Sequence, residues 1–381
     1  MLGPRLAAEF GLSAGQLGLL TASYFAASIL IQLPLGMMLD RYGPRRVNAA
    51  LFVLTVAGAL LFASAGSYEA LVLGRALIGL GVAAALMGAM HAFVLWNPRE
   101  KIGVLIAVVY ATGGLGILVT SFPLAWALGV FTWREIFVAL AGVSLAIVLL
   151  LAFWVPERTA ARRPESLRAQ LAGLGEILRD PGVRRATLVL AANQFAVIPL
   201  LNLWMATWLR DVAGFAEGAV AWMLALVALA MIAGYLVFGR VGDALVRRGG
   251  TEFPAYVAVL ASTLAVLAPL VLGVTQGLTI LWPLFIFFGM GASLAFAIAN
   301  RRFPPEYAGR VNTVLNFFAL LAMFSGQWLI GGVLGLWPQT PGGGYDPRGY
   351  TVALGVQWVV LAAALVWLWS GRELFRATRP A

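Results

Sequence analysis

Apolar residues form long runs, and short breaks rich in charge, proline or glycine separate them. Most runs approach the ~20 residues with which an α-helix crosses the hydrocarbon core of a bilayer. The runs are continuous rather than alternating, which indicates helices and not a β-barrel. The pattern predicts eleven membrane spans, at 14–38, 46–65, 70–96, 102–127, 134–155, 186–209, 218–240, 253–274, 278–299, 309–337 and 350–370.

Composition supports an all-α, multi-pass membrane protein. Hydrophobic residues make up 61% of the chain and charged residues 11%, whereas soluble domains carry about 25% charged residues. The chain has no Cys and one His, His91, and we place no Asp or Glu in the middle of a span. Thiol chemistry, zinc clusters and paired catalytic carboxylates are therefore disfavoured. We expect no enzyme activity, cofactor or metal.

The positive charge of the chain is concentrated in alternate loops. If the eleven spans alternate in direction, 21 of the 26 Lys and Arg residues fall on one side. The positive-inside rule makes that side cytoplasmic, which also places the C-terminus there. This explains the net charge of +10 without a nucleic-acid partner. Because Arg outnumbers Lys 25 to 1, we expect a GC-rich bacterium and its inner membrane.

The longest cytoplasmic connection, 156–185, divides the chain into residues 1–155 and 186–381. Within it, leucines recur three or four residues apart, between Pro164 and Pro181, at Leu167, Leu171, Leu174 and Leu178. The spacing predicts an amphipathic helix on the membrane surface that joins two helix bundles. A solvated linker with chance periodicity is the alternative.

A charged turn follows the first span. Its glycines permit a sharp reversal and its arginines suit anionic lipid headgroups. The turn resembles the signature G-x-x-x-D-R-x-G-R-R of the major facilitator superfamily, with Pro44 where Arg is common. The residues that carry this resemblance are Gly36, Asp40, Arg41, Gly43, Arg45 and Arg46.

Two further motifs support the resemblance. Gly239 to Asp243 repeats the spacing of Gly36 to Asp40 at a distance of 203 residues, as two parallel halves would show. The run that begins with Arg75 and contains Gly79 resembles the family's fourth-helix motif with its buried Arg. An Arg inside a span is a functional candidate because it is costly to bury. The alternative is that Arg75 extends to the outer interface.

The resemblance implies two pseudo-symmetric six-helix bundles that rock around a central site. It makes the Asp40 turn a cytoplasmic latch between bundles and Arg75 a coupling or substrate-binding residue. It also identifies spans 14–38 and 46–65 with the family's second and third helices. We therefore expect a first helix to be missing from the N-terminal bundle, through truncation rather than a natural shortening.

Polar side chains on common helical faces are candidates for a central cavity, since a face that lines water is polar and a lipid-facing one is not. The alternative for each is a hydrogen bond between packed membrane helices. Together with Arg75, the candidates are Tyr24, Gln32, Tyr110, Asn193, Trp204, Asn316 and Gln327.

These observations predict a secondary transporter of a small organic solute. Arg75 and the lack of buried carboxylates favour an anion. The resemblance implies proton coupling, and we expect a monomer in contact with membrane lipids. The alternatives are a proton-driven exporter of lipophilic compounds and a non-transporting sensor on a transporter scaffold.

Overall fold

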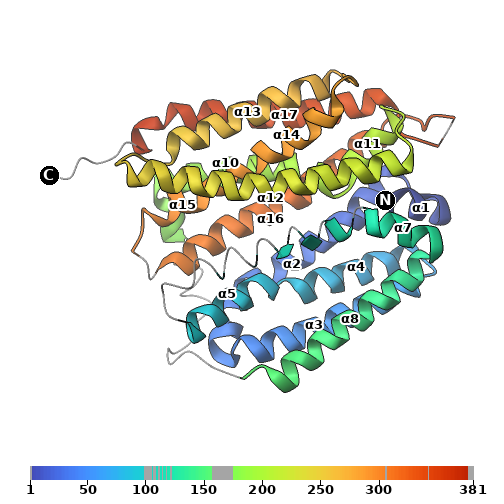
Figure 1. Cartoon of the computed structure of the whole chain (residues 1–381), viewed down its shortest axis with the longest axis horizontal. Helices are drawn as coiled ribbons and strands as arrows, with labels where there is room; N and C mark the ends of the chain where they lie inside the picture. Colours follow the sequence, from blue (N-terminus) through green and yellow to red (C-terminus); the bar gives the residue numbers. More distant parts are fainter. Residues whose placement is uncertain are drawn as a thin grey trace.

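The computed structural model describes residues 2–97, 105, 109, 112–113, 115–116, 118–120, 122–156, 175–304, 307–341 and 343–375. This part of the chain is helical and contains no strand. The long helices run side by side along one direction (Figure 1).

Each half of the chain contributes its own set of helices. The first half contains α1 (Leu2–Phe10), α2 (Ala14–Tyr42), α3 (Pro44–Ala63), α4 (Tyr68–Val82), α5 (Ala85–Trp96), α7 (Phe122–Val130) and α8 (Trp133–Trp154). The second half contains α10 (Pro181–Pro199), the π-helical turn η1 (Leu200–Trp204), α11 (Met205–Asp211), α12 (Glu217–Arg247), α13 (Phe253–Val271), α14 (Leu278–Met290), η2 (Gly291–Ser293), α15 (Leu294–Asn300), α16 (Ala308–Leu334), α17 (Pro347–Ser370) and η4 (Arg372–Phe375).

Within the described residues, ten helical segments are long and apolar enough to cross a membrane. They coincide with ten of the eleven predicted spans. The remaining span, 102–127, and the linker segment 157–174 lie largely or wholly outside the described residues, so the amphipathic linker helix stays a prediction.

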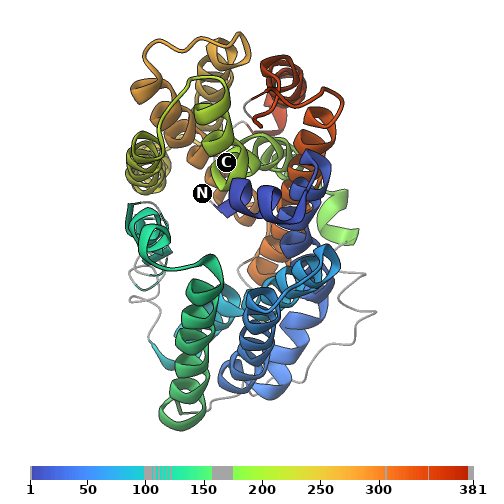
Figure 2. The same cartoon turned by 90° about the vertical axis from the view of Figure 1, so that its right-hand side faces the viewer.

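The two halves repeat one packing pattern. In the first half α3 packs against α4 and α8, and in the second half α13 packs against α14 and α17. Viewed along the helices, the halves form two groups, which meet where α2 packs against α16 (Figure 2). The predicted all-α architecture of two pseudo-symmetric bundles is confirmed.

The halves differ around α10. In the second half α10 packs against α15 and α17, and its Ala186 carbonyl accepts a hydrogen bond from the Tyr256 hydroxyl of α13 at 3.3 Å. In the first half the corresponding helices α3, α5 and α8 line an apolar groove of about 280 Å³, between Asn48, Gly88 and Leu151. The expectation of a further helix in this half stays a prediction.

Local signals in the sequence set the helix ends. Ser13 and Gln16 form a reciprocal capping box at the start of α2, and Thr132 and Glu135 do the same at α8. Gly43 has a φ of 81°, which only glycine adopts readily, and it both ends α2 and precedes α3. The charged turn therefore has a single non-helical residue, Gly43, between two long helices.

Small residues bring α3 and α4 into backbone contact. A Cβ on Gly58 would lie 2.7 Å from the carbonyl oxygen of Gly74, and one on Gly74 would lie 2.9 Å from the carbonyl of Gly58. Both distances are shorter than van der Waals contact. The sequence thus permits an approach that any larger residue would prevent.

We predict that Gly58→Leu lowers the thermal unfolding midpoint in detergent, because the added side chain overpacks the α3–α4 contact at a cost of about 1–3 kcal/mol. The matched control is Gly142→Leu on α8, where a Cβ meets open space. An equal loss of stability in both variants would contradict this account of the packing.

Candidate functional site

The molecule has two ends. We call the end with α1 and the start of α2 the Ser13 end, and the end with the α2–α3 turn and the end of α17 the Gly43 end (Figure 1). The predicted site residues lie at different depths between them.

Arg75 lies against Tyr24. The Arg75 Cζ is 5.3 Å from the centroid of the Tyr24 ring, and both residues are partly buried. In the described part of the chain no carboxylate forms an ion pair with Arg75. The stretch 101–121 contains no Asp or Glu either. A guanidinium stacked on an aromatic ring still has its N–H donors at its edge, where they can form hydrogen bonds.

The α2–α4 contact positions this pair. The Ser28 Oγ lies 2.9 Å from both the Gly79 carbonyl and the Tyr24 carbonyl, which share its one hydroxyl proton. A Cβ on Gly79 would overlap the Tyr24 carbonyl. The glycine of the fourth-helix motif therefore places α4, and with it Arg75, directly against α2.

The other candidates of the first half are Gln32 and Tyr110, and Asn316 is a candidate in the second half. Gln32 is 3% exposed, and its Nε2 is 3.4 Å from the Met87 sulfur, a weak acceptor. Asn316 is partly buried on α16. Tyr110 lies outside the described residues.

Asn193 has a packing role. It is fully buried, and its Nδ2 donates to the Gly289 carbonyl of α14 at 2.9 Å. This is the interhelical hydrogen bond that the sequence left open as the alternative.

Trp204 and Gln327 meet where the two halves touch. The Trp204 Nε1 donates to the main-chain carbonyl of Gln327 at 3.4 Å, and both side chains are fully buried. A Cβ on Gly18 of α2 would lie 3.0 Å from the same carbonyl and 3.4 Å from the Trp204 ring. These two candidates are brought together, but at the Ser13 end rather than beside Arg75.

Glycines close the contact between the halves. A Cβ on Gly331 of α16 would lie 2.5 Å from the Ala14 carbonyl and 3.1 Å from the Gly18 Cα. We call the contact of Ala14 and Gly18 with Gly331 the glycine seam. Tyr24 follows Gly18 by six residues, about 9 Å along a helix. The Arg75–Tyr24 pair therefore lies on the Gly43 side of a closed seam.

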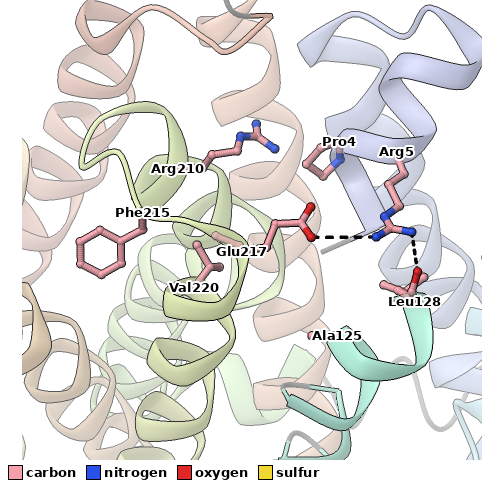
Figure 3. Close-up of a pocket in the computed structure, with 9 residues that line it drawn as sticks. Pro4, Arg5, Ala125, Leu128, Arg210, Phe215, Glu217 and Val220 are labelled. Atoms are coloured by element: carbon pink, nitrogen blue, oxygen red, sulfur yellow. Dashed lines mark hydrogen bonds and ion pairs between the residues drawn. The ribbon is translucent and has the colours of Figure 1, made fainter. Parts of the chain in front are cut away.

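A second contact between the halves lies at the same end (Figure 3). Arg5 donates to the Leu128 carbonyl at 2.9 Å and lies 4.0 Å from the Glu217 carboxylate of α12. Glu217 is 89% exposed, so this ion pair is weak. The cavity beside it holds about 60 Å³, room for a few waters, whereas ligand pockets measure about 300–1,000 Å³. We assign this region to closure of the Ser13 end.

The residues of the predicted latch, in the charged turn and at Asp243, have different surroundings. Arg45 donates to the Ala152 carbonyl of α8 at 2.5 Å, which ties it to its own half. Arg41 stacks on Tyr42 at 5.2 Å, and Asp243 is exposed on α12. Gly36 lies inside α2, Arg46 inside α3, and the Asp40 side chain is outside the described part. The predicted latch between bundles stays a prediction.

Two buried carboxylates were not predicted from the sequence: Glu252, which pairs with Arg301 at 2.6 Å, and Asp211. Asp211 ends α11 with its side chain 2% exposed. Its oxygens accept from Arg210 Nε at 2.8 Å, the Tyr350 hydroxyl at 2.9 Å and the Tyr345 amide at 3.1 Å. Burial, followed by the nearby Asp211 charge, raises the pKa of Tyr345 to about 12. Only the Arg210–Asp211 pair was visible in the sequence, because the other partners lie over 130 residues away.

Known proteins resemble the chain over most of its length. The family model described as Major Facilitator Superfamily matches residues 1–327. The probable sulfoacetate transporter SauU of Cupriavidus necator is 28% identical over 83% of this chain and 71% of its own. The probable galactarate/D-glucarate transporter GudP of Bacillus subtilis is 25% identical over 85% and 78%.

Solved structures share the fold. A bacterial homologue of the human lysosomal transporter Spinster has a TM-score of 0.75 at 16% identity, covering 100% of this chain and 94% of its own. The D-xylose-proton symporter has a TM-score of 0.75 at 16% identity, covering 99% and 93%.

We predict that Asp211→Asn lowers the thermal unfolding midpoint, since hydrogen bonds to a charged group contribute about 1.5–3 kcal/mol. The control is Asp243→Asn, an exposed Asp whose substitution should change stability by less than about 0.5 kcal/mol. If both variants melt alike, the Asp211 cluster does not hold α11 to the start of α17.

Proposed function

Because the chain belongs to the Major Facilitator Superfamily and is a membrane transporter, not an enzyme, we propose that it carries a small organic anion, with Arg75 as the residue that binds the negative charge. The observation that carries the proposal is a guanidinium inside a span with no carboxylate partner among the described residues. An anion would supply the missing counter-charge, which a neutral solute would not.

The relatives support an acidic solute. The SauU and GudP proteins are named for sulfoacetate and for galactarate and D-glucarate, all of them organic acids. Tyr24 covers one side of the Arg75 guanidinium and leaves its edge, where the N–H groups point, for a carboxylate or sulfonate.

We further propose that the Ser13 end faces the outside of a bacterial inner membrane and the Gly43 end, with the C-terminus, the cytoplasm. The basic loops at the Gly43 end support this orientation. The closed glycine seam then separates Arg75 from the outside, and transport by a single chain requires the seam to open. Proton coupling is part of the proposal. Asp211, the buried carboxylate at the Ser13 end, already accepts three hydrogen bonds from residues of its own half.

The decisive experiment is uptake into proteoliposomes with an imposed pH gradient, using sulfoacetate, D-glucarate and neutral glucose. We predict uptake of an acid but not of glucose. Arg75→Gln should raise the KM at least about tenfold, since a charge-assisted hydrogen bond contributes about 1.5–3 kcal/mol. Arg75→Lys should retain part of the activity.

The control for charge alone is Arg348→Gln, an exposed Arg at the start of α17, which should transport normally. Uptake that is indifferent to Arg75→Gln would overturn the assignment of the site. Export of lipophilic cations without any uptake of acids would instead favour the exporter alternative, and no flux at all would favour the sensor.

Opening of the seam can be tested by cross-linking, since the chain contains no Cys. A Cβ on Gly335 would lie 3.9 Å from the Gly15 amide nitrogen, close enough for a disulfide after small adjustments. We predict that oxidised Gly15→Cys/Gly335→Cys stops uptake and that dithiothreitol restores it. Each single variant should be unaffected by oxidation. Full activity of the cross-linked protein would show that the seam stays closed during transport.

A further inference from the structure

Gln327 is an enclosed amide without a hydrogen bond. Its side chain is 0% exposed, and neither Nε2 nor Oε1 has a partner in the described structure. Enclosing an unbonded amide costs free energy, and native proteins leave few such groups. In this state of the protein the Gln327 side chain therefore carries an energetic penalty at both of its polar atoms.

That residue lies at the meeting point of both halves. Its main-chain carbonyl receives the Trp204 indole N–H and lies against Gly18 of the first half. The preceding residue, Gly326, packs against the Phe195 carbonyl and the Pro199 ring of α10. The unbonded amide thus belongs to a residue next to the glycine seam. It also lies beside α10, where the α-helix gives way to a π-helical turn after Pro199.

The helix next to it is interrupted. Pro199 has no N–H, so the Phe195 carbonyl lacks its usual α-helical donor, and Gln357 Nε2 lies 3.5 Å from it. The π-helical turn η1 follows directly. Interrupted helices and π-helical turns are frequent at binding sites of membrane transporters.

Other buried polar groups of the second half also lack a partner, namely Thr187 Oγ1, Trp282 Nε1, Asn193 Oδ1, Asn300 Oδ1 and Gln357 Oε1. Each of these three amides still donates one hydrogen bond, as Asn193 does to Gly289. The Thr263 hydroxyl donates to the Val259 carbonyl at 2.9 Å. Among the buried amides of the described residues, Gln327 is the one with both side-chain polar atoms unbonded.

We propose that Gln327 is a specificity-determining residue that hydrogen-bonds the solute's hydroxyl groups when the glycine seam is open, which makes the solute a hydroxylated organic acid. The inference rests on the proposed transport function. An amide offers two donors and one acceptor oxygen, which suits neutral hydroxyls, whereas Arg75 suits the carboxylate. Opening the seam separates glycine contacts and gives Gln327 access to partners that it lacks in the closed state.

The first test measures stability and needs no transport. Gln327→Leu removes the unbonded amide, so its thermal unfolding midpoint should rise by a few degrees. Thr263→Val should leave the midpoint nearly unchanged, and Asn193→Leu should lower it. A midpoint for Gln327→Leu that falls as far as that of Asn193→Leu would show a hidden structural bond and overturn the proposal.

The second test compares two acids of equal length in proteoliposomes, D-glucarate and its counterpart without hydroxyls, adipate. Wild type should prefer D-glucarate, and Gln327→Leu should reduce that preference at least tenfold through KM while kcat for adipate is retained. Gln327→Asn should restore part of it. An unchanged preference in Gln327→Leu overturns this inference alone, whereas a wild type that takes up neither acid, nor sulfoacetate, overturns the proposed function.

Discussion

The close approach of α2 to two neighbours is the constraint on which the rest of the structure depends. On one face Gly79 lets α4 reach the Tyr24 carbonyl, and on another Gly331 lets α16 reach Ala14 and Gly18. Between membrane helices no hydrophobic effect favours association over contact with lipid, so packing at short distance and interhelical hydrogen bonds must provide the stability. One helix thereby holds the helix that carries Arg75 and also forms the contact with the opposite half.

The α2–α4 contact and the glycine seam between α2 and α16 are held by different kinds of interaction. The α2–α4 contact includes a side-chain hydrogen bond, from Ser28 to Gly79, within one bundle. The glycine seam consists of backbone surfaces in van der Waals contact, and the accompanying Arg5–Glu217 pair is mostly solvated. Separation of the halves therefore breaks few polar interactions, while each half keeps its own, such as the Asp211 cluster. This suits a protein that moves as two bodies.

Much of this architecture could be read from the sequence. Ten spans follow from runs of apolar residues, because lipid requires each helix to be long and apolar. The turn at Gly43 and the caps at Ser13 and Thr132 follow from local chemistry. The sequence also indicates Arg75 and Tyr24 as candidates for a central cavity, because a charged or polar side chain inside a membrane span is costly to bury.

What the sequence could not decide is which polar residues meet, since that depends on contacts between distant segments. The sequence makes Asn193, Trp204 and Gln327 candidates for one central cavity, yet in the structure the Trp204 indole bonds the Gln327 carbonyl and Asn193 bonds α14. The Asp211 cluster was hidden for the same reason. The sequence alone determined the membrane spans and the presence of the Arg75 charge inside one of them. Only the tertiary structure decided that Arg75 lies beyond a closed seam, because closure depends on how near two glycine-bearing helices from opposite halves can approach.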